Sequence, residues 1–348
     1  LHLGPARIDL GKLVVGYQEQ KGEVGVEVFL RQTLCKTGRK RLRDRPQDVV
    51  LYGFGQIGRM LARILIERSG GHGWRLRAVV TRTKSGGDLM KRASLLRRDS
   101  VHGRFNGTIV TDREENALVV NGNMIRILYA DAPEDVDFTR YGIQDAIVVD
   151  NAGTWRDREG LGRHLKARGV SRVILTAPGE GDVPNIVYGV NNEDIKVEER
   201  ALSAASCTTN AIVPVLKVMH DRFDIEHGHI ETCHSYTNDQ NLIDNYHKKS
   251  RRGRGAPLNM VITETAAASA VAKVLPELDG KLTANAIRVP TPNVSLAILN
   301  LTLSRESSAE EVNTYLRDIS LDSPLQGQID YTSSPEVVSS DFVGTLKT

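Results

Sequence analysis

Apolar and polar positions follow a sharp pattern from Asp48 onward. Residues 49–52 form an apolar run that Gly53 ends, and apolar side chains then recur at helical spacing at Ile57, Leu61 and Ile64. An apolar run, a glycine and an amphipathic repeat predict a strand, a tight turn and a helix, in that order.

Further apolar runs of strand length lie at residues 76–80, 146–149 and 173–176, with a helical segment at 158–167. Strands that alternate with crossover segments predict a parallel, doubly wound sheet. We therefore expect an α/β protein whose residues 48–206 form a dinucleotide-binding (Rossmann) domain.

The pattern changes after about residue 206. Longer alternating runs occupy residues 229–236 and 286–303, and Ser308 with Glu311 three residues later is typical of a helix start. These features predict a second domain of α+β type over residues 207–348.

Residues 1–47 show no clear period and carry six basic residues between positions 36 and 45. We interpret this part as an extension or linker. A contact with nucleic acid or a membrane surface is the alternative, but short charge runs are more often simply solvated.

Composition excludes several classes of protein. The 348 residues are 40% hydrophobic and 26% charged, with a net charge of +3, which is too even for a dedicated nucleic-acid binder. No apolar stretch approaches the roughly 18 residues of a membrane span. The cysteines, Cys35, Cys207 and Cys233, are too few for a disulfide scaffold. We expect a cytoplasmic protein because this cysteine usage favours a reducing compartment.

The turn after the first strand has the spacing G-x-G-x-x-G, formed by Gly53, Phe54, Gly55, Gln56, Ile57 and Gly58. Its glycines permit a tight turn, close approach of a pyrophosphate and close helix packing, while the helix N-terminus faces the anion. The motif predicts a dinucleotide site. An ordinary glycine-rich turn is the alternative.

The dinucleotide fingerprint expects an acidic residue about 20 residues later to bind the ribose 2′-hydroxyl. No Asp or Glu occurs from Arg68 to Gly87, and the second strand instead leads into Thr81, Arg82, Thr83 and Lys84. Hydroxyl and guanidinium groups would accept a 2′-phosphate that a carboxylate would repel. NADP or NAD is therefore expected as cofactor, with NADP favoured.

Cys207 lies between an apolar segment and a helical repeat, in Ser206-Cys207-Thr208-Thr209-Asn210. A thiol at a helix N-terminus has a favoured thiolate, and a nearby imidazole such as His234 would lower its pKa further. A small buried cysteine and an unrelated histidine are the alternative.

Several motifs together resemble the phosphorylating glyceraldehyde-3-phosphate dehydrogenases. They are Gly53-Phe54-Gly55, Asp99-Ser100-Val101-His102-Gly103, Ser206-Cys207-Thr208-Thr209-Asn210, His234-Ser235-Tyr236-Thr237-Asn238-Asp239 and Arg288-Val289-Pro290-Thr291-Pro292-Asn293-Val294. The resemblance covers roughly residues 48–344. It implies a Rossmann domain, a catalytic domain with a mostly antiparallel sheet, and a homotetramer.

The resemblance also implies roles for individual residues. Cys207 would be the nucleophile and His234 its base. Thr237 and Arg288 would bind the phosphate of the substrate, and Ser206, Thr208, Thr265 and Ala266 would surround an attacking inorganic phosphate. Thr176 would lie near the nicotinamide, and the basic loop 246–255 near a neighbouring cofactor, unless that loop is only solvated. No metal site is implied.

Several positions depart from the family pattern. Gln56 replaces an arginine, Ala152 a hydroxyl residue, Ala266 a glycine, and Ala211 a second cysteine that the reaction does not need. The final strand motif of the family is absent before Thr348, so we expect an incomplete chain.

The resemblance implies the reversible, phosphorylating oxidation of D-glyceraldehyde 3-phosphate to 1,3-bisphosphoglycerate. The expected partners are this small substrate, inorganic phosphate and further copies of the chain, with neither membrane nor nucleic acid. The alternatives are an erythrose-4-phosphate dehydrogenase and a non-catalytic homologue that has acquired another role.

Overall fold

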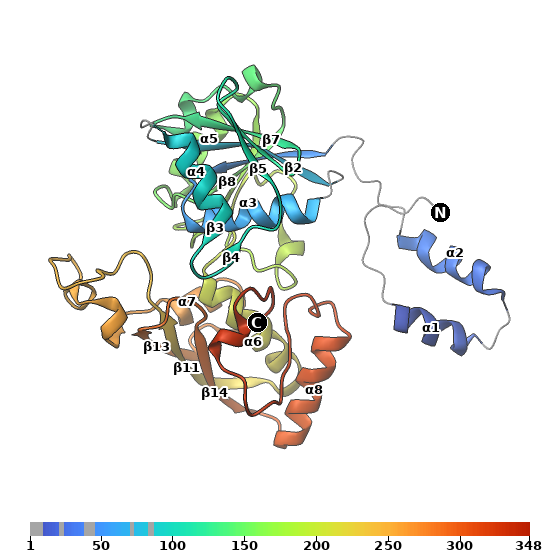
Figure 1. The fold of residues 1–348 in the computed structure, drawn as a ribbon. Coiled ribbons are helices and arrows are strands. Elements are labelled where there is room, and N and C mark those ends of the chain that lie inside the picture. Colours follow the sequence, from blue (N-terminus) through green and yellow to red (C-terminus); the bar gives the residue numbers. More distant parts are fainter. Residues whose placement is uncertain (1–9, 21–23, 38–45, 70–72, 83–86) are drawn as a thin grey trace. The chain divides into compact units, whose positions relative to one another are not determined.

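The computed structural model describes residues 10–20, 24–37, 46–69, 73–82 and 87–348 (Figure 1). An eight-stranded sheet has the order β10-β9-β8-β1-β2-β7-β6-β5. Its strands are β1 (Gln47–Tyr52), β2 (Trp74–Thr81), β5 (Ile109–Asp112), β6 (Ala117–Val120), β7 (Asn123–Tyr129), β8 (Ala146–Asp150), β9 (Val170–Leu175) and β10 (Ala201–Ser203). β1 pairs in parallel with β2 and β8, and β2 with β7, whereas β5, β6 and β7 form an antiparallel edge. The predicted α/β fold with a mostly parallel sheet is confirmed.

Helices α3 (Gln56–Ser69) and α4 (Asp88–Arg97) pack on this sheet, α3 against β1 and β2 and α4 against β5 and β6. The helix predicted at 158–167 is α5 (Arg158–Lys166). Leu51, Val79 and Leu96 are fully buried in the core beneath α3 and α4. That core keeps the glycine turn between β1 and α3 in place, because both elements that flank the turn are anchored.

A second sheet has the order β12-β13-β11-β14. Its strands are β11 (Ile225–Ser235), β12 (Val261–Thr263), β13 (Leu282–Val289) and β14 (Leu296–Leu303). β11 runs parallel to β13, and the other two pairings are antiparallel. The run 286–303, expected as one segment, is split into two strands. Pro290 and Pro292 lie at the break, where neither can donate to a strand ladder.

Helices α6 (Cys207–Phe223), α7 (Ala267–Ala272) and α8 (Ala309–Leu321) accompany this second sheet. Leu216, Ile230 and Val271 are fully buried in their shared core. Ser308 caps α8 by accepting a hydrogen bond from the Glu311 N–H at 3.1 Å, as the sequence predicts.

Short elements complete the described chain. β3 (Arg98–Asp99) and β4 (Gly103–Arg104) pair with each other. Single turns of 3-10 helix lie at η1 (Pro133–Asp135), η2 (Phe138–Tyr141), η3 (Asn192–Asp194), η4 (Ser250–Gly253), η5 (Ala256–Leu258), η6 (Pro276–Leu278) and η7 (Ser339–Phe342). No helix among the described residues has the length and apolar character needed to cross a bilayer.

The chain divides into two compact units whose segments alternate along the sequence. Unit 1 comprises Leu1–Arg97, Phe105–Ala152 and Arg163–Arg172, and unit 2 comprises Arg98–Arg104, Gly153–Gly162 and Val173–Thr348. Unit 2 therefore takes two short segments from the first half of the chain, an exchange that the predicted boundaries at 48–206 and 207–348 do not include.

The extension before residue 48 differs from the expected aperiodic linker, because it contains α1 (Leu10–Glu19) and α2 (Val26–Thr37). The rings of Tyr17 and Phe29 meet edge to face, 5.5 Å apart, and Phe29 is buried. Gly16 lies against the Phe29 ring, and such glycines hide the helical period from a sequence pattern. Most of the predicted basic run, residues 38–45, lies outside the described residues.

Candidate functional site

Cys207 is the first residue of α6, and His234 is the penultimate residue of β11. Ser206 caps the helix by accepting the N–H of Thr209 at 3.0 Å. The helix therefore begins at the cysteine, so the thiol lies in its first turn. The Cys207 Sγ lies 3.5 Å from Nε2 of His234, within hydrogen-bond range for sulfur.

The surroundings of Cys207 favour its thiolate. The hydrogen bond with His234 lowers the pKa of the Cys207 thiol below its usual range, and the charge of His234 and hydrogen bonds from Thr208 act in the same direction. Burial opposes them. The thiol is nevertheless exposed to solvent, so a small molecule can reach the sulfur.

Arg288 lies next to His234 because β13 pairs in parallel with β11, with Arg288 opposite His234. Its NH1 nitrogen is 2.9 Å from Nδ1 of His234 and 3.0 Å from the Ser235 carbonyl oxygen. The same nitrogen donates to the Thr237 hydroxyl at 3.2 Å. Three separate segments of the sequence thus meet in unit 2, and they carry Cys207, His234 with Thr237, and Arg288.

Two further charged residues belong to this group. Asp239 accepts hydrogen bonds from Thr237 and Arg252, and Arg252 also donates to the Thr263 hydroxyl at 3.1 Å. Burial and the nearby Arg252 lower the pKa of Arg288, while Asp239 and Cys207 act in the opposite direction. Sequence reasoning gave Asp239 no role and treated Arg252 only as one charge of the basic loop. The density of arginines in that loop was the available signal.

The residues predicted around an attacking phosphate lie at two helix starts in unit 2. Ser206 and Thr208 flank Cys207 at the start of α6. The Thr265 hydroxyl accepts the N–H of Ala267 at 3.2 Å, just before α7, while Ala266 is exposed and has no side-chain cap. Ser206 and Thr265 thus accept backbone N–H groups at the starts of α6 and α7, places where anions also bind.

Thr176 follows β9 directly, and Leu175 at the end of that strand pairs with Ser203. The Ser203 hydroxyl donates to the Ala177 carbonyl at 2.7 Å, which ties this turn to the segment that leads into Ser206. Thr176 therefore belongs to the same unit as Cys207.

The glycine turn lies in unit 1, and each glycine has a separate steric reason. Gly53 has φ +95°, and a Cβ there would stand 3.1 Å from the Ala152 nitrogen. A Cβ on Gly58 would stand 2.4 Å from the Gly53 carbonyl oxygen. Gly55 has open space around it, which leaves room for a pyrophosphate at the start of α3. Phe54 is buried, whereas Gln56 and Ile57 are exposed.

The second strand ends at Thr81, which is buried and whose hydroxyl has no hydrogen-bond partner among the described residues. A bound ribose is one group that would supply this partner. Arg82 follows and is exposed, while Thr83 and Lys84 lie outside the described residues. The turn and this strand end thus fit a dinucleotide, which Gly53, Gly55, Thr81 and Arg82 would hold.

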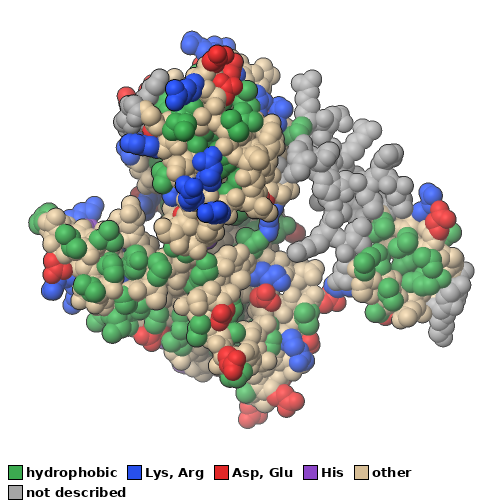
Figure 2. Space-filling view, in the orientation of Figure 1, with side chains coloured by type: hydrophobic (Ala, Val, Ile, Leu, Met, Phe, Trp, Pro, Cys, Tyr) green, Lys and Arg blue, Asp and Glu red, His purple; other side chains and the backbone are tan. Residues whose placement is uncertain are grey.

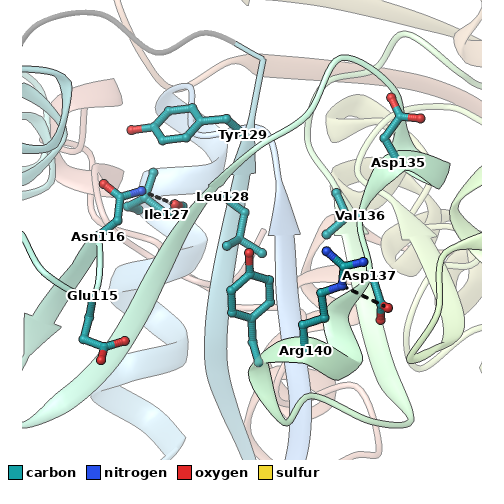
Figure 3. A pocket seen from close by; sticks show the side chains of 10 residues that line it. Glu115, Asn116, Ile127, Leu128, Tyr129, Asp135, Val136, Asp137 and Arg140 are labelled. Carbon is teal, nitrogen blue, oxygen red and sulfur yellow. Dashed lines mark hydrogen bonds and ion pairs between the residues drawn. The ribbon is translucent and has the colours of Figure 1, made fainter.

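Unit 1 also contains a pocket of about 390 Å³ (Figure 3). Leu128 and Val136 supply apolar lining, and the Arg140 guanidinium reaches the Asp137 carboxylate at 3.5 Å. None of the residues predicted for the active site appears in its described lining. The described lining of this cavity therefore shares no residue with the glycine turn.

A dinucleotide-binding protein of the Rossmann type is the class that the parallel sheet and its glycine turn define. The NAD binding domain of glyceraldehyde 3-phosphate dehydrogenase matches residues 47–158, and the C-terminal domain of that enzyme matches residues 206–348. The chain belongs to the glyceraldehyde-3-phosphate dehydrogenase family.

Relatives support the same assignment. A glyceraldehyde-3-phosphate dehydrogenase-like protein of Pseudomonas aeruginosa strain UCBPP-PA14 is 59% identical over 99% of this chain and 76% of its own. The chloroplastic glyceraldehyde-3-phosphate dehydrogenase GAPA1 of Arabidopsis thaliana is 42% identical, over 92% of this chain and 78% of its own. A glyceraldehyde-3-phosphate dehydrogenase of P. aeruginosa PAO1 is also 42% identical, over 84% of each chain. The first alignment is long enough to include α1 and α2.

Proposed function

We propose that this chain catalyses the reversible, phosphorylating oxidation of D-glyceraldehyde 3-phosphate to 1,3-bisphosphoglycerate with NAD(P). The observation that carries the proposal is the contact of 3.5 Å between the Cys207 sulfur and His234 Nε2, with Arg288 beside it. A thiol, an adjacent base and a guanidinium are the groups that oxidation of a phosphorylated aldehyde through a thioester requires.

The cysteine and the histidine divide the covalent work. The Cys207 thiolate attacks the aldehyde carbon, and the resulting alkoxide takes a proton from the protonated His234 imidazole to give a thiohemiacetal. His234 then takes the hydroxyl proton as the carbon is oxidised to a thioester. The nicotinamide, when bound, supplies the acceptor for the hydride. Attack of inorganic phosphate on the thioester carbon releases the acyl phosphate and restores the Cys207 thiolate.

Phosphate recognition follows from the hydroxyl and guanidinium groups nearby. Arg288 and Thr237 share a hydrogen bond of 3.2 Å and would bind the phosphate that the substrate already carries. Ser206, Thr208, Thr265 and Ala266 would surround the inorganic phosphate, at helix starts where free N–H groups favour anions. This division assigns one anion site to each phosphate.

The cofactor would bind at the glycine turn, with Thr176 near its nicotinamide. We favour NADP over NAD because the exposed Arg82 and the hydroxyl of Thr81 end the strand where a carboxylate would otherwise select NAD. Two arginines of the basic loop are already engaged, Arg252 with Asp239 and Arg254 with Asp244 at 2.8 Å, which weakens that loop as a 2′-phosphate site.

We also propose a homotetramer in which the outer face of the second sheet is one subunit interface. Ile262, Ile287, Cys233 and Leu296 form one row of paired residues across the strands. Ile262 is 64% exposed and Leu296 60% exposed. Figure 2 has hydrophobic side chains gathered where β13 and β11 lie in Figure 1. An exposed apolar patch of this kind is typical of a protein interface, and a second copy offers the same row in return.

A cytoplasmic location is part of the proposal, because an exposed nucleophilic thiol at Cys207 functions only while it stays reduced.

One assay tests the reaction. Purified protein is mixed with glyceraldehyde 3-phosphate or erythrose 4-phosphate, with and without inorganic phosphate, and with NAD or NADP. We expect absorbance at the reduced-cofactor band only with the triose phosphate and phosphate together, and faster with NADP. No reduction with either aldehyde would contradict the proposal.

A further inference from the structure

The loop between β13 and β14, residues 290–295, contains a strained backbone position beside the catalytic histidine. Val294 has φ +63°, in the left-handed region that a β-branched residue rarely adopts. Such a conformation persists only where the surroundings hold it, and strained positions of this kind cluster at functional sites. The contacts that hold Val294 therefore need an account.

One set of contacts ties the loop to the end of β11. The Ser235 hydroxyl donates to the Val294 carbonyl at 2.6 Å, and the Ser235 N–H donates to the Ser295 hydroxyl at 3.3 Å. The next residue, Tyr236, donates its N–H to the Thr291 carbonyl at 3.2 Å. Ser235 is the residue after His234, so the loop fixes the main chain on which the histidine depends.

The other contact ties the loop to the segment Arg98–Arg104 of unit 2. The Asn293 amide nitrogen lies 3.2 Å from Nε2 of His102, and Nδ1 of His102 lies 3.0 Å from the Asp99 carboxylate. Burial acts to raise the pKa of Asp99, but hydrogen bonds from His102 and Val101 lower it to about 2. Asp99 is thus an acceptor only, so His102 donates from Nδ1 and accepts the Asn293 amide at Nε2.

The Ser235 carbonyl is where this network meets the catalytic histidine. Its oxygen lies 2.7 Å from Nδ1 of His234 and can only accept, so this contact orients the ring through an Nδ1–H donated to the carbonyl. The Arg288 NH1 nitrogen, 2.9 Å from the same Nδ1, can only donate and therefore makes no hydrogen bond to that N–H. It converges instead on the Ser235 carbonyl oxygen at 3.0 Å. Nε2 of His234 is then the nitrogen left to exchange a proton beside the Cys207 sulfur. Any shift of the carbonyl would let the ring turn away from the sulfur.

We propose that Asn293 and His102 are positioning residues for His234. By holding Val294 in its left-handed conformation, they fix the Ser235 carbonyl that orients the imidazole toward Cys207. This inference rests on the proposed function of Cys207 and His234, but it concerns residues to which neither substrate nor cofactor binding is assigned above.

The test combines substitution of the two anchor residues, Asn293 and His102, with removal of the backbone strain at Val294. Asn293→Ala should lower kcat about ten- to a hundredfold, with little change in KM for glyceraldehyde 3-phosphate, because misplacement of one catalytic group costs that much. The rate of Cys207 alkylation by iodoacetamide should fall at neutral pH, and its pH midpoint should rise toward that of an ordinary thiol. His102→Leu breaks the same hydrogen bond from the other side and should give the same changes, whether or not Asn293→Ala folds.

Val294→Gly should restore kcat and the alkylation profile in the Asn293→Ala background, because glycine adopts positive φ without strain. The matched control is Asp224→Gly, which relieves a residue with φ +56° at the other end of β11. It should stabilise the Asn293→Ala protein without restoring kcat.

Three results would overturn the inference. They are unchanged kcat and alkylation in both anchor variants, no restoration by Val294→Gly, or equal restoration by Asp224→Gly. Alkylation needs no aldehyde or cofactor. The two proposals can therefore fail separately. If the wild-type protein had no dehydrogenase activity but the Asn293→Ala and His102→Leu variants still shifted the alkylation profile, the proposed reaction would be wrong and the positioning role would stand.

Discussion

The glycine turn of unit 1 and the cysteine cluster of unit 2 achieve specificity in opposite ways. The turn depends on side chains that are missing, since Gly53 and Gly58 each lie where a Cβ would meet backbone atoms. The cluster depends on side chains that are present, since Cys207 contacts His234 and His234 in turn lies against Arg288. A backbone site tolerates no added atom, whereas a side-chain site tolerates no lost group. Substitutions should therefore fail in different ways in the two units.

The largest effect is expected for Cys207→Ser. A hydroxyl at this place is a far weaker nucleophile than a thiolate, so turnover should fall below detection. Cofactor binding, measured by fluorescence quenching, should stay within about twofold of wild type because unit 1 is unchanged. Residual turnover close to that of the wild type would remove Cys207 from the reaction.

His234→Asn comes next, with a loss of kcat of about 10² to 10⁴-fold, the usual contribution of a positioned base. His234 lowers the pKa of Cys207, so the wild-type thiolate persists to lower pH than an ordinary thiolate. As the pH falls, the variant should lose its reactivity with iodoacetamide at a higher pH than the wild type does. Identical pH profiles would mean that His234 does not activate the sulfur.

Arg288→Ala removes the guanidinium at the end of the cluster. KM for glyceraldehyde 3-phosphate should rise about tenfold or more, because a charge-assisted hydrogen bond contributes roughly 1.5 to 3 kcal/mol. Plain glyceraldehyde, which has no phosphate, serves as the control substrate and should be affected much less. Equal losses on both substrates would indicate a structural arginine.

Gly58→Ala probes the turn from the opposite side. Intrinsic propensity favours alanine in a helix by about 1 kcal/mol. The added Cβ would, however, stand 2.4 Å from the Gly53 carbonyl oxygen, and overpacking typically costs about 1 to 3 kcal/mol. We expect a lower unfolding midpoint and weaker cofactor binding, with unchanged alkylation of Cys207. A more stable variant would contradict this expectation and show that the Gly53 carbonyl moves to make room for the added Cβ.

Arg82→Asp comes last because it should change only the choice of cofactor. The ratio of kcat/KM for NADP to that for NAD should fall about tenfold or more, because a phosphate partner is replaced by a repelling charge. Arg68→Asp, which changes the same charge at the end of α3, is the matched control. A strong preference for NAD in the wild type, unchanged in Arg82→Asp, would refute the cofactor proposal.

Sequence predicted the parts of this molecule that local pattern determines. The strand, glycine turn and helix at residues 49–65 follow from apolar spacing alone, and the Ser308 cap from one residue pair. Pattern could not predict that β11 and β13 run parallel, since register depends on partners distant in the chain. The pairing that sets Arg288 beside His234 is of this kind. The family resemblance implied that Arg288 binds a phosphate, but it did not give this contact. The helices α1 and α2 were missed because α1 contains two glycines and each helix is short.

The alternation of segments between the two units has a consequence for how the protein folds. The hydrogen bond between His102 and Asn293 closes a loop of 191 residues. Closing so long a loop costs conformational entropy before any native contact compensates for it, and such topology slows folding. During synthesis, the Arg98–Arg104 segment leaves the ribosome long before Asn293 exists. We therefore expect the last step of folding to be the docking of that early segment onto a late one.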